Sequence, residues 1–326
     1  MKKKDKSRIL ILKGLTLHLK GMPLKKIDNF YNLYFHENSF REVDISFTNY
    51  LTNNTIRNRG IIEAILKQYV KKKLPKNFIE VKAAIMLGIS QILFSKTPLY
   101  ASVNSTVDLF EGKIKKWRNF ANAVLRNICR DREKLEKSKN DLRNILPEWI
   151  YSDWSRQFGL KNTHKLAELY KEEPSLDIRV KNNINFWVKE LNGEKLGKNT
   201  VRIFNRGKIE NLKGYTKGLW WVQDIASQIP VNLMGNIKNK TILDLCASPG
   251  GKTAQMLNEG AIVKAIDIST QRVEKLKNNI DRIGLCKNFQ VEVLDIMSIN
   301  LKAKFDVVLL DAPCTGTGTF RKNPDV

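Results

Sequence analysis

Three aspartates follow apolar, strand-like segments near the carboxyl end of the sequence, at Asp267, Asp295 and Asp311. The segments before them read AIVKAI, FQVEVL and FDVVLL, and a fourth, TILDL, leads into the turn at 246–253, CASPGGKT. Nearly all-apolar strands that alternate with helices indicate a parallel sheet covered by helices. Ligands of such open sheets bind outside the carboxyl ends of the strands. The pattern therefore predicts one site built from the turn and the three aspartates.

The turn after the first strand supplies backbone for binding a ligand. Its glycines allow close approach of the main chain, and the helix that follows presents unpaired N–H groups to an electronegative partner. Asp267 ends the second strand, 23 residues after Asp244, where a carboxylate can accept hydrogen bonds from ribose hydroxyls. Together these features indicate a nucleoside cofactor. The residues of the turn are Cys246, Ala247, Ser248, Pro249, Gly250, Gly251 and Lys252.

Two other nucleotide-binding schemes fit these residues less well. The G-x-G-x-x-G fingerprint of dinucleotide-binding proteins is absent, which disfavours a dehydrogenase. A phosphate-binding P-loop is the stronger alternative, because Gly251, Lys252 and Thr253 match its last positions and FDVVLLD matches a strand with a magnesium-binding Asp. Its first glycine would fall on Cys246, however, and Asp267 has no part in that scheme. An NTP-binding protein stays as an alternative.

Several motifs occur together that resemble a known family. DLCASPGGKT, the aspartates at 267 and 295, and LLDAPCTGTGTFRKNPD look like the RNA cytosine-5 methyltransferases of the RsmB type, also called Sun or Fmu, which modify 16S ribosomal RNA. PEWIYSDWSRQFG, LDIRVKN and WWVQDIASQIP are similar to the connector of that family, and LYASVNSTVDL and NFANAVLRNICR to its NusB-like helical domain. The resemblance covers nearly the whole chain. It implies S-adenosyl-L-methionine as cofactor and cytosine in 16S rRNA as substrate.

The resemblance also implies roles for the site residues. The turn at 246–252 would hold the methionine portion of the cofactor, Asp267 its ribose and Asp295 its adenine. Asp311 would lie beside the cofactor and the target base. We further expect Asp311 to polarise the pyrimidine at N3 once the base is unstacked into the pocket.

The reaction needs a thiolate, and the sequence gives two different indications of its source. Methylation at cytosine C5 requires a thiolate that adds at C6 and makes C5 nucleophilic. Proximity nominates Cys314, which follows Asp311 at the end of the fourth strand. The resemblance instead implies a nucleophile in a later Thr-Cys motif, with Cys314 assisting product release. The sequence ends at Val326 without such a motif, so we expect a fragment or a protein that has lost activity.

The pattern of apolar and polar residues changes twice along the chain and divides it into three segments. Residues 1–140 carry apolar residues at helical spacing and predict an all-α domain, which the resemblance identifies as NusB-like and RNA-binding. Residues 141–236 mix helical and strand-like runs with glycines and predict a small α+β connector, which the resemblance implies would position RNA. Residues 237–326 predict a parallel sheet with helices, which by the resemblance is the first half of a Rossmann-like methyltransferase domain. Its fourth strand would expose an apolar edge, so we expect poor solubility.

Composition limits the partners and the compartment. The formal charge is +24, and residues 1–140 hold 29 Lys and Arg against 12 Asp and Glu, which favours nucleic acid as partner. A non-catalytic RNA-binding protein is therefore a further alternative. The lysine run at 71–73 either contacts phosphate or forms a solvated helix end.

Four scattered cysteines and three histidines predict neither a metal site nor a disulfide framework, and no apolar run is long enough for a membrane span. We expect a cytoplasmic monomer.

Overall fold

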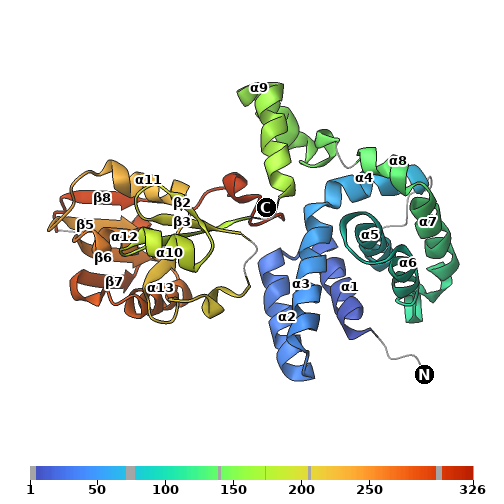
Figure 1. Ribbon diagram of the computed structural model, residues 1–326, viewed down its shortest axis with the longest axis horizontal. Coiled ribbons are helices and arrows are strands. Elements are labelled where there is room, and N and C mark those ends of the chain that lie inside the picture. The colour runs from blue at the N-terminus through green and yellow to red at the C-terminus, as the bar shows by residue number, and fades with distance from the viewer. Residues whose placement is uncertain are drawn as a thin grey trace. The chain divides into compact units, whose positions relative to one another are not determined.

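The computed structural model describes residues 5–70, 78–138, 141–172, 174–204, 207–298 and 303–325. The chain divides into two compact units, Met1–Glu173 with Gly316–Val326, and Pro174–Thr315. A helical region comes first and an α/β region with a parallel sheet follows, so the predicted fold class is confirmed (Figure 1). The finer division into three domains stays a prediction, and the lysine run at 71–73 lies outside the described residues.

The first unit is built from helices. Its central helix, α5 (Ile79–Phe94), is mostly apolar and packs against α1, α3, α4, α6 and α7, as expected for a helix buried on nearly all sides. Gly88 permits this packing, because an added Cβ would lie 2.6 Å from Cδ2 of Leu125 on α7. The other helices are α1 (Lys6–Leu19), α2 (Leu24–Asn38), α3 (Glu42–Arg57), α4 (Arg59–Tyr69), α6 (Leu99–Val107), η1 (Gly112–Trp117), α7 (Arg118–Arg130), α8 (Arg132–Ser138), η2 (Leu142–Asn144) and α9 (Glu148–Lys171).

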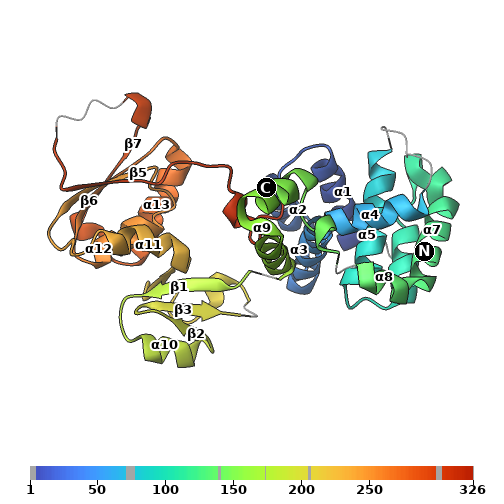
Figure 2. The same ribbon diagram turned by 90° about the horizontal axis from the view of Figure 1, so that it is seen from above.

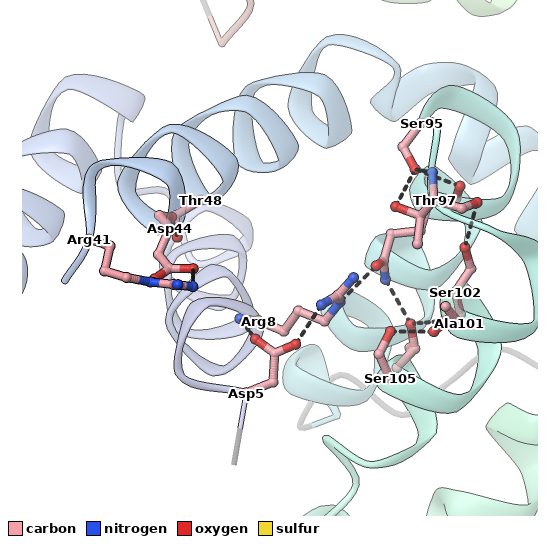
Figure 3. Close-up of polar contacts among 12 residues, drawn as sticks. Asp5, Arg8, Arg41, Asp44, Thr48, Ser95, Thr97, Ala101, Ser102 and Ser105 are labelled. Atoms are coloured by element: carbon pink, nitrogen blue, oxygen red, sulfur yellow. Dashed lines mark hydrogen bonds and ion pairs between the residues drawn. The ribbon is translucent and has the colours of Figure 1, made fainter. Parts of the chain in front are cut away.

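Polar side chains join three of these helices beside the apolar core (Figure 3). Asp5 caps α1 by accepting the backbone N–H of Arg8 at 3.0 Å. Arg8 Nε donates to Gln91 Oε1 on α5 at 2.8 Å, and Gln91 Nε2 donates to Thr106 Oγ1 on α6 at 2.9 Å. Gln91 is fully buried, so both ends of its amide need these partners.

The helix α9 belongs to the same core as the preceding helices. Its buried residues Ile150, Ala167 and Tyr170 join the hydrophobic cluster of the first unit. Gly159 interrupts the helical backbone with φ 78°, a conformation that glycine adopts without a steric penalty. The sequence motifs PEWIYSDWSRQFG and HKLAELYKE therefore form the two halves of one kinked helix. Among the described helices of the chain, none combines the length and apolarity that crossing a bilayer requires.

The second unit starts with a small antiparallel sheet in the order β2-β3-β1-β4, of which Figure 2 labels β1, β2 and β3. The strand-like runs LDIRVK and TVRIF form two of its strands, as predicted, and Trp220 and Trp221 supply a third that the sequence pattern did not reveal. Trp187 and Trp220 fill its core. The elements are β1 (Leu176–Val180), α10 (Ile184–Glu190), β2 (Glu194–Leu196), β3 (Thr200–Ile203), η3 (Ile209–Asn211), β4 (Trp220–Val222) and α11 (Ile225–Leu233).

A four-stranded parallel sheet in the order β7-β6-β5-β8 completes the second unit. All four predicted strands are present, with the predicted helices between them. On β8, Val308 and Leu310 are 56% and 57% exposed, which is the apolar surface expected on this edge strand; its effect on solubility stays a prediction. The elements are β5 (Thr241–Leu245), α12 (Gly251–Asn258), β6 (Ile262–Asp267), α13 (Thr270–Arg282), η4 (Cys286–Asn288), β7 (Phe289–Val293), η5 (Ile296–Ser298) and β8 (Val307–Leu310).

Candidate functional site

The turn between β5 and α12 has an unusual backbone. Cys246 has φ 60° and Gly250 has φ 97°, both in the left-handed region. Ala247 N donates to Ile266 O at 3.0 Å and Gly250 N donates to Ala247 O at 2.9 Å, so the turn folds back against β6. An added Cβ on Gly250 would lie 3.1 Å from Leu276 Cγ of α13. The backbone conformation at Gly250 favours glycine, and a Cβ would in addition be tight against Leu276.

Asp267 joins this turn to the end of β6. Its side chain is 1% exposed. Oδ2 accepts the backbone N–H of Ser248 at 3.1 Å, and Oδ1 accepts that of Ser269 at 3.2 Å. The structure thus places the first turn and the second strand end in direct contact, as the strand order predicts.

Arg272 is a site residue that sequence reasoning missed. Its Nη2 lies 3.3 Å from Asp267 Oδ2 and donates to Ser248 O at 2.7 Å. The sequence pattern showed only that it lies in a helix. One signal was available: Arg272 stands in the first turn of α13, where the helix dipole disfavours a cation unless a carboxylate is near.

The end of β8 meets the same turn through an ion pair. Lys252 Nζ lies 2.6 Å from Asp311 Oδ2, with the lysine side chain 17% exposed and the aspartate side chain 60% exposed. Asp295 is exposed just after β7, and its Oδ1 accepts the backbone N–H of Met297 at 2.9 Å within its own turn. Cys314 is exposed in the loop after Asp311. The structure therefore brings together residues 246–252, Asp267 and Asp311.

Comparison with known proteins covers both units. Residues 232–326 match the family model of the 16S rRNA methyltransferase RsmB/F, and residues 5–130 match that of the NusB family. The ribosomal RNA small subunit methyltransferase B of Proteus mirabilis is 30% identical over 296 residues, which are 83% of this chain and 68% of that protein. The chain belongs to the ribosomal RNA small subunit methyltransferase B family.

Other relatives agree with this assignment. The methyltransferase B of Cronobacter sakazakii is 28% identical over 291 residues, 83% of this chain and 67% of that protein. The crystal structure of PH0851 covers 100% of this chain and 78% of its own, with a TM-score of 0.67 at 19% identity, and supports the fold alone. The resemblance drawn from the motifs is confirmed, and the methyltransferase B family is one of RNA-methylating enzymes.

The four cysteines of this methyltransferase B chain differ in their surroundings. Burial raises the pKa of the Cys129 thiol, and burial together with the Asp267 carboxylate raises that of Cys246. A hydrogen bond from Cys286 Sγ to Asp281 Oδ1, at 2.8 Å, raises the pKa of Cys286. A raised pKa lowers the thiolate fraction at neutral pH. At neutral pH these three thiols are therefore thiolate to a smaller extent than an ordinary cysteine.

The turn has spare hydrogen-bonding capacity that a nucleoside ligand can use. Ser248 Oγ is buried and, within the part of the chain that the structure describes, has no hydrogen-bond partner. A carboxylate offers about four acceptor sites. Three groups contact the Asp267 carboxylate, which leaves room for a further donor. These residues fit a ligand that carries hydroxyl groups. No group of three or more His, Cys, Asp or Glu that would hold a metal ion is found among the described residues.

Asp244 lies beneath the turn as a buried carboxyl. Thr253 Oγ1 donates to its Oδ2 at 2.6 Å, and both residues are almost completely shielded from solvent. Burial raises the pKa of Asp244 to about 7, although the hydrogen bond from Thr253 opposes the shift. Between about pH 4, where an unfolded aspartate titrates, and pH 7, the folded state therefore binds one proton more than the unfolded state.

This proton makes stability depend on pH. The contribution of Asp244 is fully present below about pH 4 and is lost as the pH rises through 7. Asp244→Asn is neutral at all pH values, so we expect its melting temperature, relative to the unmodified chain, to be higher at pH 8 than at pH 5. The control is Asp306→Asn: hydrogen bonds from Thr241 lower the pKa of this exposed carboxyl, so it stays ionised from pH 5 to 8. Equal differences at both pH values for Asp244→Asn would refute the argument.

Proposed function

We propose that this chain binds S-adenosyl-L-methionine and 16S ribosomal RNA for methylation at cytosine C5. The observation that carries the proposal is the contact of the CASPGGK turn with Asp267, beside the unpartnered Ser248 Oγ. The sheet order β7-β6-β5-β8 adds support. It arranges Asp295, Asp267, the turn and Asp311 along one edge, in an order that would suit adenine, ribose, methionine and target base.

Each part of the cofactor would be held by different residues. Residues 246–252 would hold the methionine portion, Asp267 the ribose hydroxyls and Asp295 the adenine. Arg272 covers Asp267, and its side chain is 44% exposed, so it can turn toward solvent when a ribose takes its place. When bound, S-adenosylmethionine supplies the methyl group.

Asp311 and Cys314 would act on the target base. Lys252 orients the Asp311 carboxylate through the ion pair, and we assign this carboxylate to the polar edge of the cytosine at N3. Cys314 follows Asp311 by three residues and is exposed. We assign it to product release, as the family resemblance implies; the same resemblance gives the attack on C6 to the cysteine of a Thr-Cys motif, and residues 1–326 contain no Thr-Cys pair.

The geometry does not favour the P-loop alternative. In a P-loop the threonine hydroxyl binds Mg²⁺ and the lysine binds phosphate. Here Thr253 is fully buried and donates its hydroxyl to Asp244, and the Lys252 ammonium pairs with Asp311. Neither group is presented to a triphosphate.

The first unit offers a cationic surface for RNA. A hollow of about 610 Å³ at the start of α7 is lined by four cations and two neutral residues. Trp117 packs edge-on against Phe78 and Phe120, which fixes the backbone of η1 from the inside. The lining residues are Gly112, Lys113, Lys115, Lys116, Arg118 and Asn119.

Calorimetry with S-adenosylmethionine and, separately, with Mg·ATP tests which cofactor the chain binds. We expect the chain to bind S-adenosylmethionine without metal, and Asp267→Asn to weaken binding at least about 10-fold, because a charge-assisted hydrogen bond contributes about 1.5–3 kcal/mol. Glu292→Gln on β7 changes charge equally at an exposed position and should bind normally. Binding of Mg·ATP without binding of S-adenosylmethionine would replace this proposal with the P-loop.

Charge removal tests the RNA surface. The triple variant of Lys113, Lys115 and Lys116 to Ala should bind a 16S RNA fragment more weakly, with the slope of log K against log salt reduced by about 2, since each phosphate contact on single strands contributes about 0.7. The control replaces the exposed Lys20, Lys25 and Lys26, which changes the net charge equally. An equal loss of RNA affinity in the two triple variants would show that net charge alone, and not this surface, determines binding.

The role of Cys314 can be tested with a cytosine analogue. A 5-fluorocytosine in the RNA cannot lose a C5 proton, so it traps the thiolate that has added at C6. With S-adenosylmethionine present, we expect this chain to form no adduct that survives a denaturing gel. An adduct that disappears in Cys314→Ser would instead make Cys314 the nucleophile.

A further inference from the structure

The residues just after the Cys314 turn fold with the helices of the first unit. Asp311–Thr315 is continuous with β8 of the second unit, whereas the residues from Gly316 onward belong to the first unit. Gly316 has φ 73° and precedes a tight turn, η6 (Thr317–Thr319). Thr319 N and Thr319 Oγ1 both donate to Gly316 O, at 2.8 and 2.7 Å. The segment is therefore locally ordered by its own hydrogen bonds.

Phe320 inserts into the core of the first unit. It is 7% exposed and belongs to the hydrophobic cluster formed around α5. Its ring stacks on Trp154 of α9 with centroids 5.7 Å apart and meets Tyr170 edge-on at 6.1 Å. Aromatic pairs at such distances are attractive beyond the area that they bury. The side chain lies six residues after Cys314.

Polar contacts hold the backbone on both sides of this ring. Arg57 Nη2 donates to Arg321 O at 2.8 Å, and Tyr170 Oη donates to Pro324 O at 2.9 Å. Asp325 Oδ2 accepts the backbone N–H of Leu24 at 2.6 Å. Leu24 starts α2, and Pro23 before it supplies no side-chain cap, so the distant aspartate caps this helix.

We propose that this segment restrains the backbone of the adjoining Cys314 turn, with Phe320 as its anchor in the core of the first unit. On one side the turn continues from β8, which is hydrogen-bonded to β5, and on the other it continues into residues held by Phe320 and Asp325. A short turn tethered on both sides has fewer backbone conformations than one that runs into a mobile segment. Binding of RNA to the helices would act on the turn through the same segment. This last step rests on the proposed function, whereas the anchor itself does not.

Hydrogen exchange of the full chain without ligands tests the anchor. We expect Phe320→Ala to raise exchange rates at least 10-fold at 320–325 and also at 311–315. Phe110→Ala is the matched control, because Phe110 is a buried phenylalanine of the same hydrophobic cluster and takes part in none of the hydrogen bonds or ring contacts described above for the segment. It should leave exchange at 311–315 unchanged. Tyr170→Phe removes only the hydrogen bond to Pro324 and should raise the same rates by a smaller factor, which gives a second test if Phe320→Ala does not fold.

Site-resolved alkylation supplies a readout of the turn itself. Cys314 should react at least 3-fold faster in Phe320→Ala, relative to Cys286 of the same molecule, and at an unchanged relative rate in Phe110→Ala. Faster exchange at 320–325 without any change at 311–315 or at Cys314 would overturn the proposal.

A further experiment repeats the hydrogen-exchange measurement in the presence of a 16S RNA fragment. RNA should slow exchange at 311–315 in the unmodified chain and not in Phe320→Ala, while the affinity for S-adenosylmethionine stays within twofold. If RNA fails to bind the unmodified chain, the proposed function is in error, and the ligand-free arms still decide the anchor. If RNA slows exchange equally in both proteins, the coupling through Phe320 is wrong.

Discussion

The buried carboxylate of Asp267 is the interaction on which the site depends. A carboxylate shielded from water is costly unless donors surround it, and here Ser248 N, Ser269 N and the Arg272 guanidinium do so. Ser248 lies in the turn after β5, and Ser269 caps α13 after β6. One side chain therefore fixes the loops that follow two strands. The left-handed backbone at Cys246 and Gly250 then has a defined direction, because the turn is held at its middle.

The small antiparallel sheet also stabilises the turn, through hydrogen bonds to the helix α12 that follows it. Arg179 on β1 is buried and donates to Gln228 on α11 and to Glu259 at the end of α12, both at 2.6 Å. Burial lowers the pKa of Arg179, and Glu259 acts against that shift. Gln223 adds a buried bond to Gln255 of α12 at 2.7 Å. Helix α12, which starts at the turn, is thus bonded to the antiparallel sheet. The antiparallel sheet therefore helps to position α12 and the turn before it.

Sequence reasoning predicted those parts that local patterns determine. The strands of the parallel sheet are apolar runs of the right length, and the clustering of their ends follows from strand direction alone. Contacts that depend on how elements pack against one another leave no such pattern. The sequence therefore did not reveal that Arg272 contacts Asp267 and Ser248. It also did not reveal that Phe320 packs on Trp154 and Tyr170. Asp295 was placed correctly at its strand end, yet its hydrogen bond is with its own turn.

The distribution of charge is compatible with the two proposed ligands, which carry opposite charge. The chain carries +24 overall, with most of the excess in the first 140 residues, which suits a polyanion such as RNA. The carboxyl edge of the parallel sheet differs, because three aspartates face only Lys252 and Arg272 among the cations that contact them in the described residues. The proposed cofactor carries a sulfonium cation, which a uniformly basic surface would repel. Under the proposed function, local acidity at Asp267, Asp295 and Asp311 would let one chain favour this cation at the sheet edge and RNA elsewhere on its surface.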